Sequence, residues 1–192
     1  VSGTLDACVT SPVALAPIDY TEGDREIYAY PLALSAPEHA AAILGERSPA
    51  LLAHVLGRDG ERRTLYDATT DPLFWSALLR LVSSRGAAKG GAGQIRGAPT
   101  PLARSLMRGE DLTPHLPNLE QSNTSATFGR QLMMKLFRRV EPGLNPEVEI
   151  GGRLTRAGYA HAPALAGSLE YEPADNGQPL TLAMLQAYVP NQ

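Results

Sequence analysis

The stretch that decides the fold is "ATFGRQLMMKLFRRVEPGLNPEVEIGGRLTRAG", residues 126–158. It opens with two runs of β-favouring residues, Ala126–Phe128 and Leu132–Phe137, which predict two neighbouring strands. A helix signal follows directly, because Asn145 can cap a helix and Pro146 suits the first helical position. The stretch therefore predicts a strand, a strand and a helix in immediate succession.

The same kind of pattern continues beyond that helix. Gly158 can end the helix, since glycine readily adopts the left-handed backbone that follows a last helical turn. Two further β-favouring runs are Leu165–Tyr171 and Leu180–Val189, and Asn176-Gly177 between them is typical of a hairpin turn. We therefore expect the second half of the chain to be an antiparallel sheet with one helix.

A charged residue, Lys135, stands inside the apolar second strand. Alternation places Met133, Lys135 and Phe137 on one face of that strand. Burying a bare ammonium group is costly, so the side chain must lie at an edge, extend to water along its apolar stem, or keep its charge near an anion. Judged from the strand alone, extension to water is the commoner solution. Arg138 and Arg139 follow, and we interpret them as surface charge, with Arg139 the weaker functional candidate because only it can share the face of Lys135.

Two flanking features favour an anion beside Lys135. Upstream, the polar residues 121–125 ("QSNTS") supply hydroxyls and backbone N–H groups that can surround phosphate oxygens, although an ordinary polar hairpin is the plain alternative. Downstream, the helix carries Glu147 and Glu149, either of which could pair with the lysine. A phosphate loop, a strand lysine and a helix glutamate are the parts with which protein-kinase-like folds hold the phosphates of a nucleotide.

The first part of the chain predicts a smaller sheet with helices beside it. Its β-favouring runs are Ala7–Val9, Ile27–Leu34, Leu51–Leu56 and Arg62–Tyr66, and Asp59-Gly60 predicts a hairpin between the last two. In "SAPEHAAAILG", Ser35 and Glu38 have the spacing of a capping box before a short helix. In "DPLFWSALLRLVSSRG", Asp71 can cap a longer amphipathic helix whose apolar stripe includes Trp75, which we assign to the core.

The glycine-rich segment Ser83–Gly97 predicts a flexible connection. A glycine tract that cradles phosphate would need a strand leading in and a helix leading out, so the linker is the favoured interpretation. We accordingly divide the chain into a domain of residues 1–88, a connection and intermediate segment of residues 89–116, and a second domain of residues 117–192.

Composition excludes several classes of protein. The chain has 17 basic and 20 acidic side chains and a net charge of −3, which argues against a surface that binds nucleic acid by neutralising phosphates. Its one cysteine, Cys8, excludes an internal disulfide, and its four histidines show no metal-ligand spacing. A reducing, cytoplasmic setting fits. No apolar run approaches the roughly 20 residues that span a bilayer, so we expect no membrane segment.

Longer stretches resemble a known family. "LEQSNTSATFGRQLMMKLFRRVEPGLNPEVEIGGRLT", "LAGSLEY" and "LAMLQAYVPNQ" resemble the corresponding part of bacterial maltokinases, including the maltokinase-like domains fused to trehalose synthases. "YAYPLAL", "LYDATTDPLFWSALL" and "IRGAPTP" resemble the cap region that precedes it in the family. The resemblance implies an α+β fold, in which an N-terminal cap of antiparallel sheet with a packed helix precedes a kinase-like nucleotide-binding lobe.

The resemblance also implies an activity. Maltokinases transfer the γ-phosphoryl group of ATP, with Mg²⁺, to the anomeric hydroxyl of maltose, and the maltose 1-phosphate serves glucan synthesis. Lys135 would be the phosphate-binding lysine, with Glu149 preferred over Glu147 as its ion-pair partner. The loop over the phosphates would comprise Gln121, Ser122, Asn123, Thr124 and Ser125. The segment "QAYVPN" would be the hinge whose backbone binds adenine, through Gln186, Tyr188 and Val189.

Some parts that such a kinase needs are not in this sequence. None of His39, His54, His115 and His161 has an aspartate two residues later, as the acceptor-positioning loop would require. We therefore expect the catalytic base and the Mg²⁺ ligands in a further lobe of a longer enzyme, no catalytic or metal-binding residue in this chain, and no phosphoryl transfer by this chain alone. The alternatives are a non-catalytic cap module of a trehalose synthase fusion and a kinase for another sugar.

Overall fold

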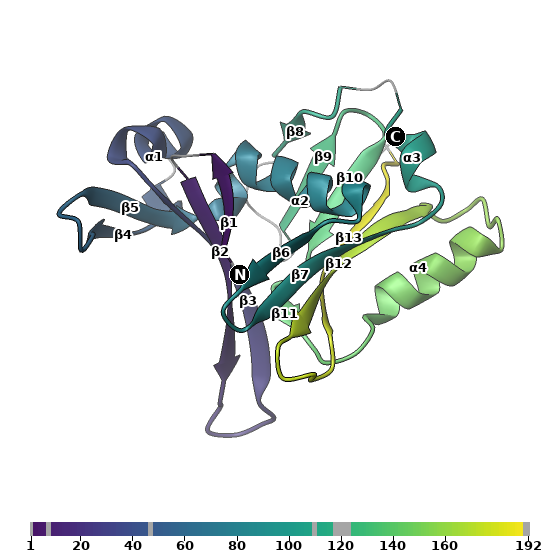
Figure 1. The fold of residues 1–192 in the computed structure, drawn as a ribbon. Coiled ribbons are helices and arrows are strands. Elements are labelled where there is room, and N and C mark those ends of the chain that lie inside the picture. Colours follow the sequence, from purple (N-terminus) through teal and green to yellow (C-terminus); the bar gives the residue numbers. More distant parts are fainter. Residues whose placement is uncertain (1, 7–8, 46–47, 109–110, 117–123, 190–192) are drawn as a thin grey trace.

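The computed structural model describes residues 2–6, 9–45, 48–108, 111–116 and 124–189. Over these residues the chain is α+β and is built from two antiparallel sheets and a few helices, which confirms the predicted fold class (Figure 1). The elements follow the sequence signals closely in the second half and less closely between residues 83 and 116.

The first sheet contains the N-terminal strands. Its neighbours run in the order β1 (Ser2–Asp6), β2 (Val9–Ile18), β3 (Glu26–Ser35), β5 (Arg62–Asp67) and β4 (Leu51–Leu56). The predicted hairpin at Asp59-Gly60 is confirmed, because β4 pairs with β5 and Gly60 has a φ of 82°. A short strand from far along the chain, β11 (Arg139–Val140), also pairs with β3.

The second sheet contains the strands around Lys135. Its order is β6 (Ala87–Gly90), β7 (Gly93–Pro99), β12 (Leu165–Pro173), β13 (Leu180–Ala187), β10 (Leu132–Leu136), β9 (Thr124–Phe128) and β8 (Pro114–His115). All its pairings are antiparallel, and β12 and β13 form the predicted hairpin.

The helices are α1 (Pro37–Leu44), α2 (Pro72–Ser84), α3 (Ala103–Leu106) and α4 (Pro146–Arg156), with single 3-10 turns η1 (Ser48–Ala50) and η2 (Ala68–Thr70). Two caps form as predicted: the Asp71 carboxylate accepts from the Leu73 N–H at 2.8 Å, and the Asn145 side chain accepts from the Glu147 N–H at 2.8 Å. Trp75 is fully buried in α2, as the apolar stripe indicates.

Helix α2 lies across one face of the second sheet (Figure 1). The contact is close because two glycines lie beneath the helix. A Cβ atom at Gly97 in β7 would collide with the Leu81 carbonyl, and one at Gly167 in β12 would lie 2.7 Å from the Val82 Cγ1 atom. Overlap at such distances is repulsive, so glycine at these positions lets helix and sheet approach.

Two expectations about secondary structure are wrong. The predicted capping box at Ser35 does not form: the cap position of α1 is Ala36 without a side-chain hydrogen bond, and the Ser35 hydroxyl donates to the Ala36 carbonyl at 3.2 Å. The glycine-rich segment is not a flexible linker, because it forms the β6–β7 hairpin and joins the second sheet through β12. The division of the chain into domains at residues 88 and 116 remains a prediction.

Candidate functional site

Lys135 projects from a central strand on the face opposite α2. It lies directly across from Ser125 in β9 and Met184 in β13, and residues opposite one another in an antiparallel ladder share a face. The neighbouring position, Met134, is fully buried and lies in the same row as Gly167, which contacts α2. Strand alternation therefore turns Met134 toward α2 and Lys135 away from it.

An ion pair joins Lys135 to helix α4. The Lys135 Nζ atom lies 2.7 Å from each carboxylate oxygen of Glu147. The lysine side chain is 20% exposed and the glutamate 53%. The same Nζ atom lies 5.4 Å from the centre of the Phe137 ring, whose negative face attracts a cation. The lysine thus keeps its charge beside an anion, one of the three solutions that its position in the strand allows.

The partner of Lys135 is Glu147, so the preference for Glu149 is wrong. Two positions along a helix differ by about 200° around its axis, so only one of the two glutamates can face the strand. Glu147 lies in the first turn, next to the point where the Asn145 N–H donates to the Thr181 Oγ1 atom of β13 at 3.2 Å. Glu149 points elsewhere and pairs with Arg153, one turn further on, at 2.7 Å.

The predicted phosphate loop is described in part. Gln121, Ser122 and Asn123 lie outside the described residues. Thr124 and Ser125 form the start of β9, and Ser125 lies opposite Lys135 on the same face. The Thr124 hydroxyl oxygen accepts from the Arg138 Nε–H at 2.9 Å. Ser125 is therefore the described loop residue that the fold brings beside the lysine.

The predicted hinge is held by hydrogen bonds at two positions. The N–H of Ala187 donates to the Ala164 carbonyl at 2.8 Å, and that of Tyr188 donates to the Gln131 carbonyl at 2.7 Å. Gln186 lies opposite Met133, on the face of Lys135, and the side chain of Val189 is 60% exposed. Residues 190 and 191 of the quoted hinge lie outside the described residues. An adenine contact at this segment would therefore use its carbonyl groups or the Val189 N–H rather than the two engaged N–H groups.

Arg138 is a structural residue that sequence reasoning misjudged as surface charge. Its Nη2 atom lies 2.8 Å from the Asp67 carboxylate and 3.2 Å from the Thr69 hydroxyl, while its Nε atom holds Thr124. The guanidinium therefore ties β9 to the end of β5 and to η2. Arg138 and Asp67 are 71 positions apart in the sequence, and no sequence pattern relates residues at that separation. Arg139, in contrast, pairs with Glu26 and Glu141 at the surface, as expected.

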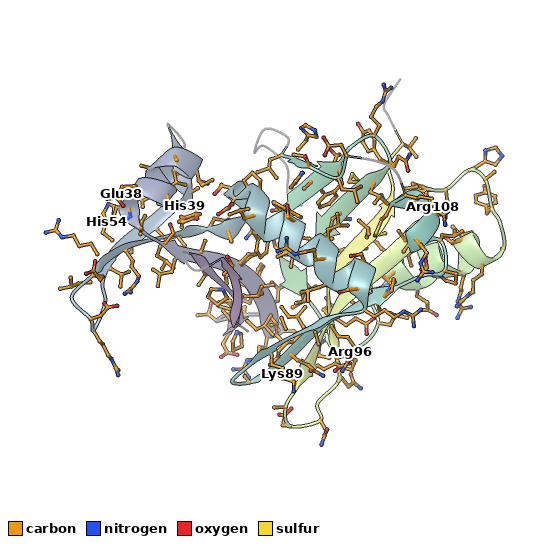
Figure 2. The ribbon with its side chains drawn as sticks, turned by 45° about the horizontal axis from the view of Figure 1, so that its top comes forward. Glu38, His39, His54, Lys89, Arg96 and Arg108 are labelled. Atoms are coloured by element: carbon orange, nitrogen blue, oxygen red, sulfur yellow. The ribbon has the colours of Figure 1, made fainter. Side chains whose placement is uncertain are left out.

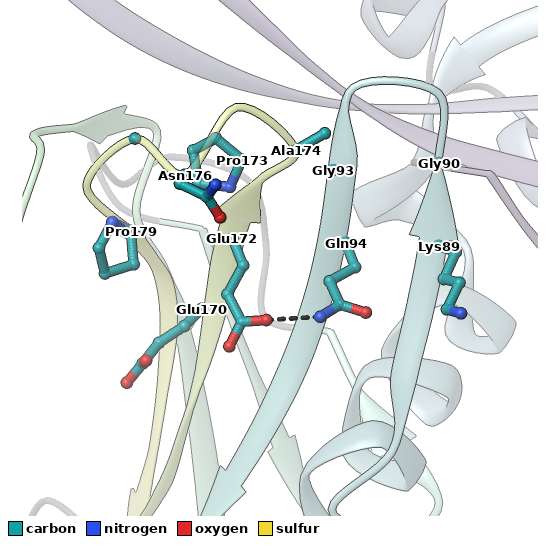
Figure 3. A pocket seen from close by; sticks show the side chains of 11 residues that line it. Lys89, Gly90, Gly93, Gln94, Glu170, Glu172, Pro173, Ala174, Asn176 and Pro179 are labelled. Carbon is teal, nitrogen blue, oxygen red and sulfur yellow. Dashed lines mark hydrogen bonds between the residues drawn. The ribbon is translucent and has the colours of Figure 1, made fainter.

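Away from Lys135, a hollow lies between the β6–β7 hairpin and the β12–β13 connection (Figure 3). Its volume is about 550 Å³. Glu172 on its wall accepts hydrogen bonds from the Gln94 amide and the Arg96 guanidinium, and these bonds lower the pKa of its carboxyl group. The Glu172 carboxylate of this hollow is therefore already engaged by neighbouring side chains.

Among the residues that the structure describes, no group of three or more His, Cys, Asp or Glu side chains is placed to hold a metal ion. No helix in the described part is both long enough and apolar enough to cross a membrane.

Comparisons with solved structures return glucosamine kinases at low sequence identity. No known family pattern matches the chain. A glucosamine kinase resembles it in one crystal form at 15% identity and a TM-score of 0.47, and in a second form at 20% and 0.41. A glucosamine kinase in complex with glucosamine, ADP and inorganic phosphate resembles it at 20% and 0.42. These matches cover 94–100% of this chain but only 35–39% of theirs, so the chain spans little more than a third of their length. Such scores are too low to establish a shared fold.

Proposed function

We propose that this chain is the cap and nucleotide-binding lobe of an ATP-dependent sugar kinase. The observation that carries the proposal is the ion pair between Lys135 in β10 and Glu147 in α4. In kinases, a strand lysine neutralises the α- and β-phosphates of ATP, and a helix glutamate holds that lysine in position. The same two residue types occupy a central strand and the helix beside it here.

The surroundings of the ion pair support a phosphate as the ligand. The lysine ammonium group lies on a face that α2 leaves uncovered, and its apolar stem is largely shielded from water. Ser125 lies on the adjoining strand, and a serine hydroxyl can donate to a phosphate oxygen. An ammonium group with three N–H donors suits a phosphate at such a position.

Maltose is the proposed acceptor, and the family resemblance of "LFRRVEPGLNPEVEI" supports it. The reaction moves the γ-phosphoryl group of ATP to the anomeric hydroxyl and yields maltose 1-phosphate. The aspartate that positions the acceptor and the ligands for Mg²⁺ belong, in this proposal, to another lobe of the full-length protein. Association or fusion with trehalose synthase is part of the same proposal, as is the absence of phosphoryl transfer by residues 1–192 alone.

Nucleotide binding tests the role of the lysine. Titration of this chain and of the full-length protein with a fluorescent ATP analogue should show weaker binding for Lys135→Ala, by roughly tenfold or more, because a charge-assisted hydrogen bond contributes about 1.5–3 kcal/mol. Lys89→Ala removes the other lysine of the chain and is the matched control. Equal affinities for the two variants in the full-length protein would contradict the proposal.

Acceptor identity needs the full-length protein. Phosphorylation of a panel that includes maltose, glucose and glucosamine should give the highest kcat/KM with maltose. A higher value with another sugar would keep the kinase and replace the acceptor. An absence of transfer to every sugar, with Lys135 intact, would favour a non-catalytic module.

A further inference from the structure

A cavity lined by three arginines lies on a different part of the second sheet. It has a volume of about 570 Å³ and lies between the end of α2, the end of β7 and α3. Its walls include Arg85, Arg104 and Arg108 together with Thr100 and Met107, and none of the described lining residues is acidic. Arg108 follows α3, at the end of the molecule away from α1 (Figure 2). The cavity shares no lining residue with the Lys135 site.

The positive charge of this cavity is a local feature. The whole chain has a net charge of −3, so three guanidinium groups around one hollow are not a consequence of a basic composition. Within the described part of the chain, the ion pairs involve other arginines, such as Arg138, Arg139 and Arg153, and not these three. Three exposed arginines therefore line the cavity, and no described carboxylate forms an ion pair with them.

Two of the arginines come from one short segment. Arg104 lies in α3 and Arg108 in the turn that follows it, and both line the cavity. Like charges around one hollow repel each other, and an anion bound among them would offset that repulsion.

The third arginine has a backbone conformation that favours glycine. Arg85 follows the last turn of α2 with φ 54° and ψ 33°, in the left-handed region. Helices commonly end with a glycine in this conformation, and Gly86 comes one position later. The negative end of the α2 dipole favours a positively charged residue in this region. It does not require that residue to occupy the left-handed position that Arg85 occupies. Such an outlier is a reason to look for a role of the side chain.

We propose that this cavity binds the phosphate group of a small phosphorylated ligand through Arg85, Arg104 and Arg108. The planar guanidinium group offers paired N–H donors that match two phosphate oxygens at once. The volume falls within the roughly 300–1,000 Å³ of small-molecule sites. The proposal does not depend on the nucleotide site, because no residue of that site lines the cavity.

Calorimetric titration of the unaltered chain with inorganic phosphate, and separately with glucose 6-phosphate, tests this site. Arg85→Gly is the most informative variant, because it relieves the backbone and should leave thermal stability unchanged or higher while it removes one phosphate contact. Arg85→Gly and Arg104→Gln should each weaken phosphate binding about tenfold, and the double variant should abolish it.

A matched control separates this site from general charge. Arg80→Gln lies on α2 outside the cavity and removes the same charge, so it should change phosphate affinity by less than about twofold. Tighter binding of glucose 6-phosphate than of phosphate would place a sugar in the cavity, whereas equal affinities would assign the site to phosphate alone. No binding of either probe by the unaltered chain, or unchanged binding by the Arg85→Gly, Arg104→Gln double variant, would overturn the proposal.

Discussion

At the scale of single residues, the position of one glutamate on its helix determines the partner of Lys135. The sequence shows that a strand lysine and two helix glutamates are close in the chain, and it supplies the Asn145 cap that starts the helix. It does not show which side of α4 faces the sheet, because the buried residue that orients the helix, Val148, lies between the two glutamates. The residue types at this site were therefore predictable, whereas the pairing depended on helix packing.

Replacement of each glutamate in turn by glutamine separates their roles. Glu147→Gln should weaken binding of an ATP analogue about fivefold, because Lys135 loses the carboxylate that holds its ammonium group. Glu149→Gln should leave the affinity unchanged, since that carboxylate pairs with Arg153. A larger loss for Glu149→Gln than for Glu147→Gln, measured by fluorescence titration, would mean that the pair seen here is not the one that supports nucleotide binding.

Asp59 in the β4–β5 turn offers a test of local electrostatics. Hydrogen bonds from Arg63 lower the pKa of its carboxyl group to about 2. Because the folded pKa lies below the unfolded value of about 3.9, the stabilising contribution is complete above that unfolded value and is lost as the pH falls through about 2. Arg63→Gln should move the Asp59 titration, followed by NMR, back toward about 3.9. The same midpoint in both proteins would show that Arg63 does not lower this pKa.

At the scale of elements, most signals that depend on a few neighbouring residues were reliable, with the capping box at Ser35 as an exception. The caps at Asp71 and Asn145, the Asp59-Gly60 turn and the alternation in β10 all appear where the sequence places them. The glycine-rich segment was misjudged because its strands are stabilised by partners far away in the chain. β7 pairs with β12, and its glycine at position 97 serves the contact with α2 rather than flexibility.

Two glycines of the β6–β7 region should respond differently to the same substitution. Gly97→Ala should lower the free energy of unfolding by about 1–3 kcal/mol, because the added methyl group would meet the Leu81 carbonyl of α2. Gly91→Ala, in the turn of the hairpin, is the control, since a Cβ atom there has nothing within 4 Å. Urea denaturation measures both. Equal losses would mean that α2 and β7 are not as close as the structure shows.

At the scale of the whole molecule, Arg138 connects the two sheets. Its guanidinium group holds Asp67 and Thr69 on one side and Thr124 on the other. The carboxylate of Asp67 also accepts from the Thr69 N–H at 2.9 Å, so the arginine joins a network that is already ordered. Thr124 is itself a residue of the predicted phosphate loop. The predicted cap therefore supports the strand that carries part of the candidate nucleotide site.

Neighbouring arginines provide a matched test of this connection. Arg138→Gln should lower the free energy of unfolding by about 1.5–3 kcal/mol, because the half-buried Asp67 carboxylate loses a charged donor. Arg139→Gln should change it by less than about 1 kcal/mol, since its pairs lie at the surface. Chemical denaturation measures the free energy of unfolding of the two variants. A similar loss for both would indicate that Arg138 is not a structural link.

The pairing of β11 with β3 determines when the first sheet can be completed during synthesis. Tyr28 in β3 lies opposite Arg139 in β11, and the Ala29 N–H donates to the Arg138 carbonyl at 2.7 Å. Ribosomes add roughly 5–20 residues per second, so β3 leaves the exit tunnel several seconds before this last neighbour exists. During that interval the nascent N-terminal sheet has an incomplete edge. A pause in translation once residue 140 has left the exit tunnel would let this sheet close before the remaining strands emerge.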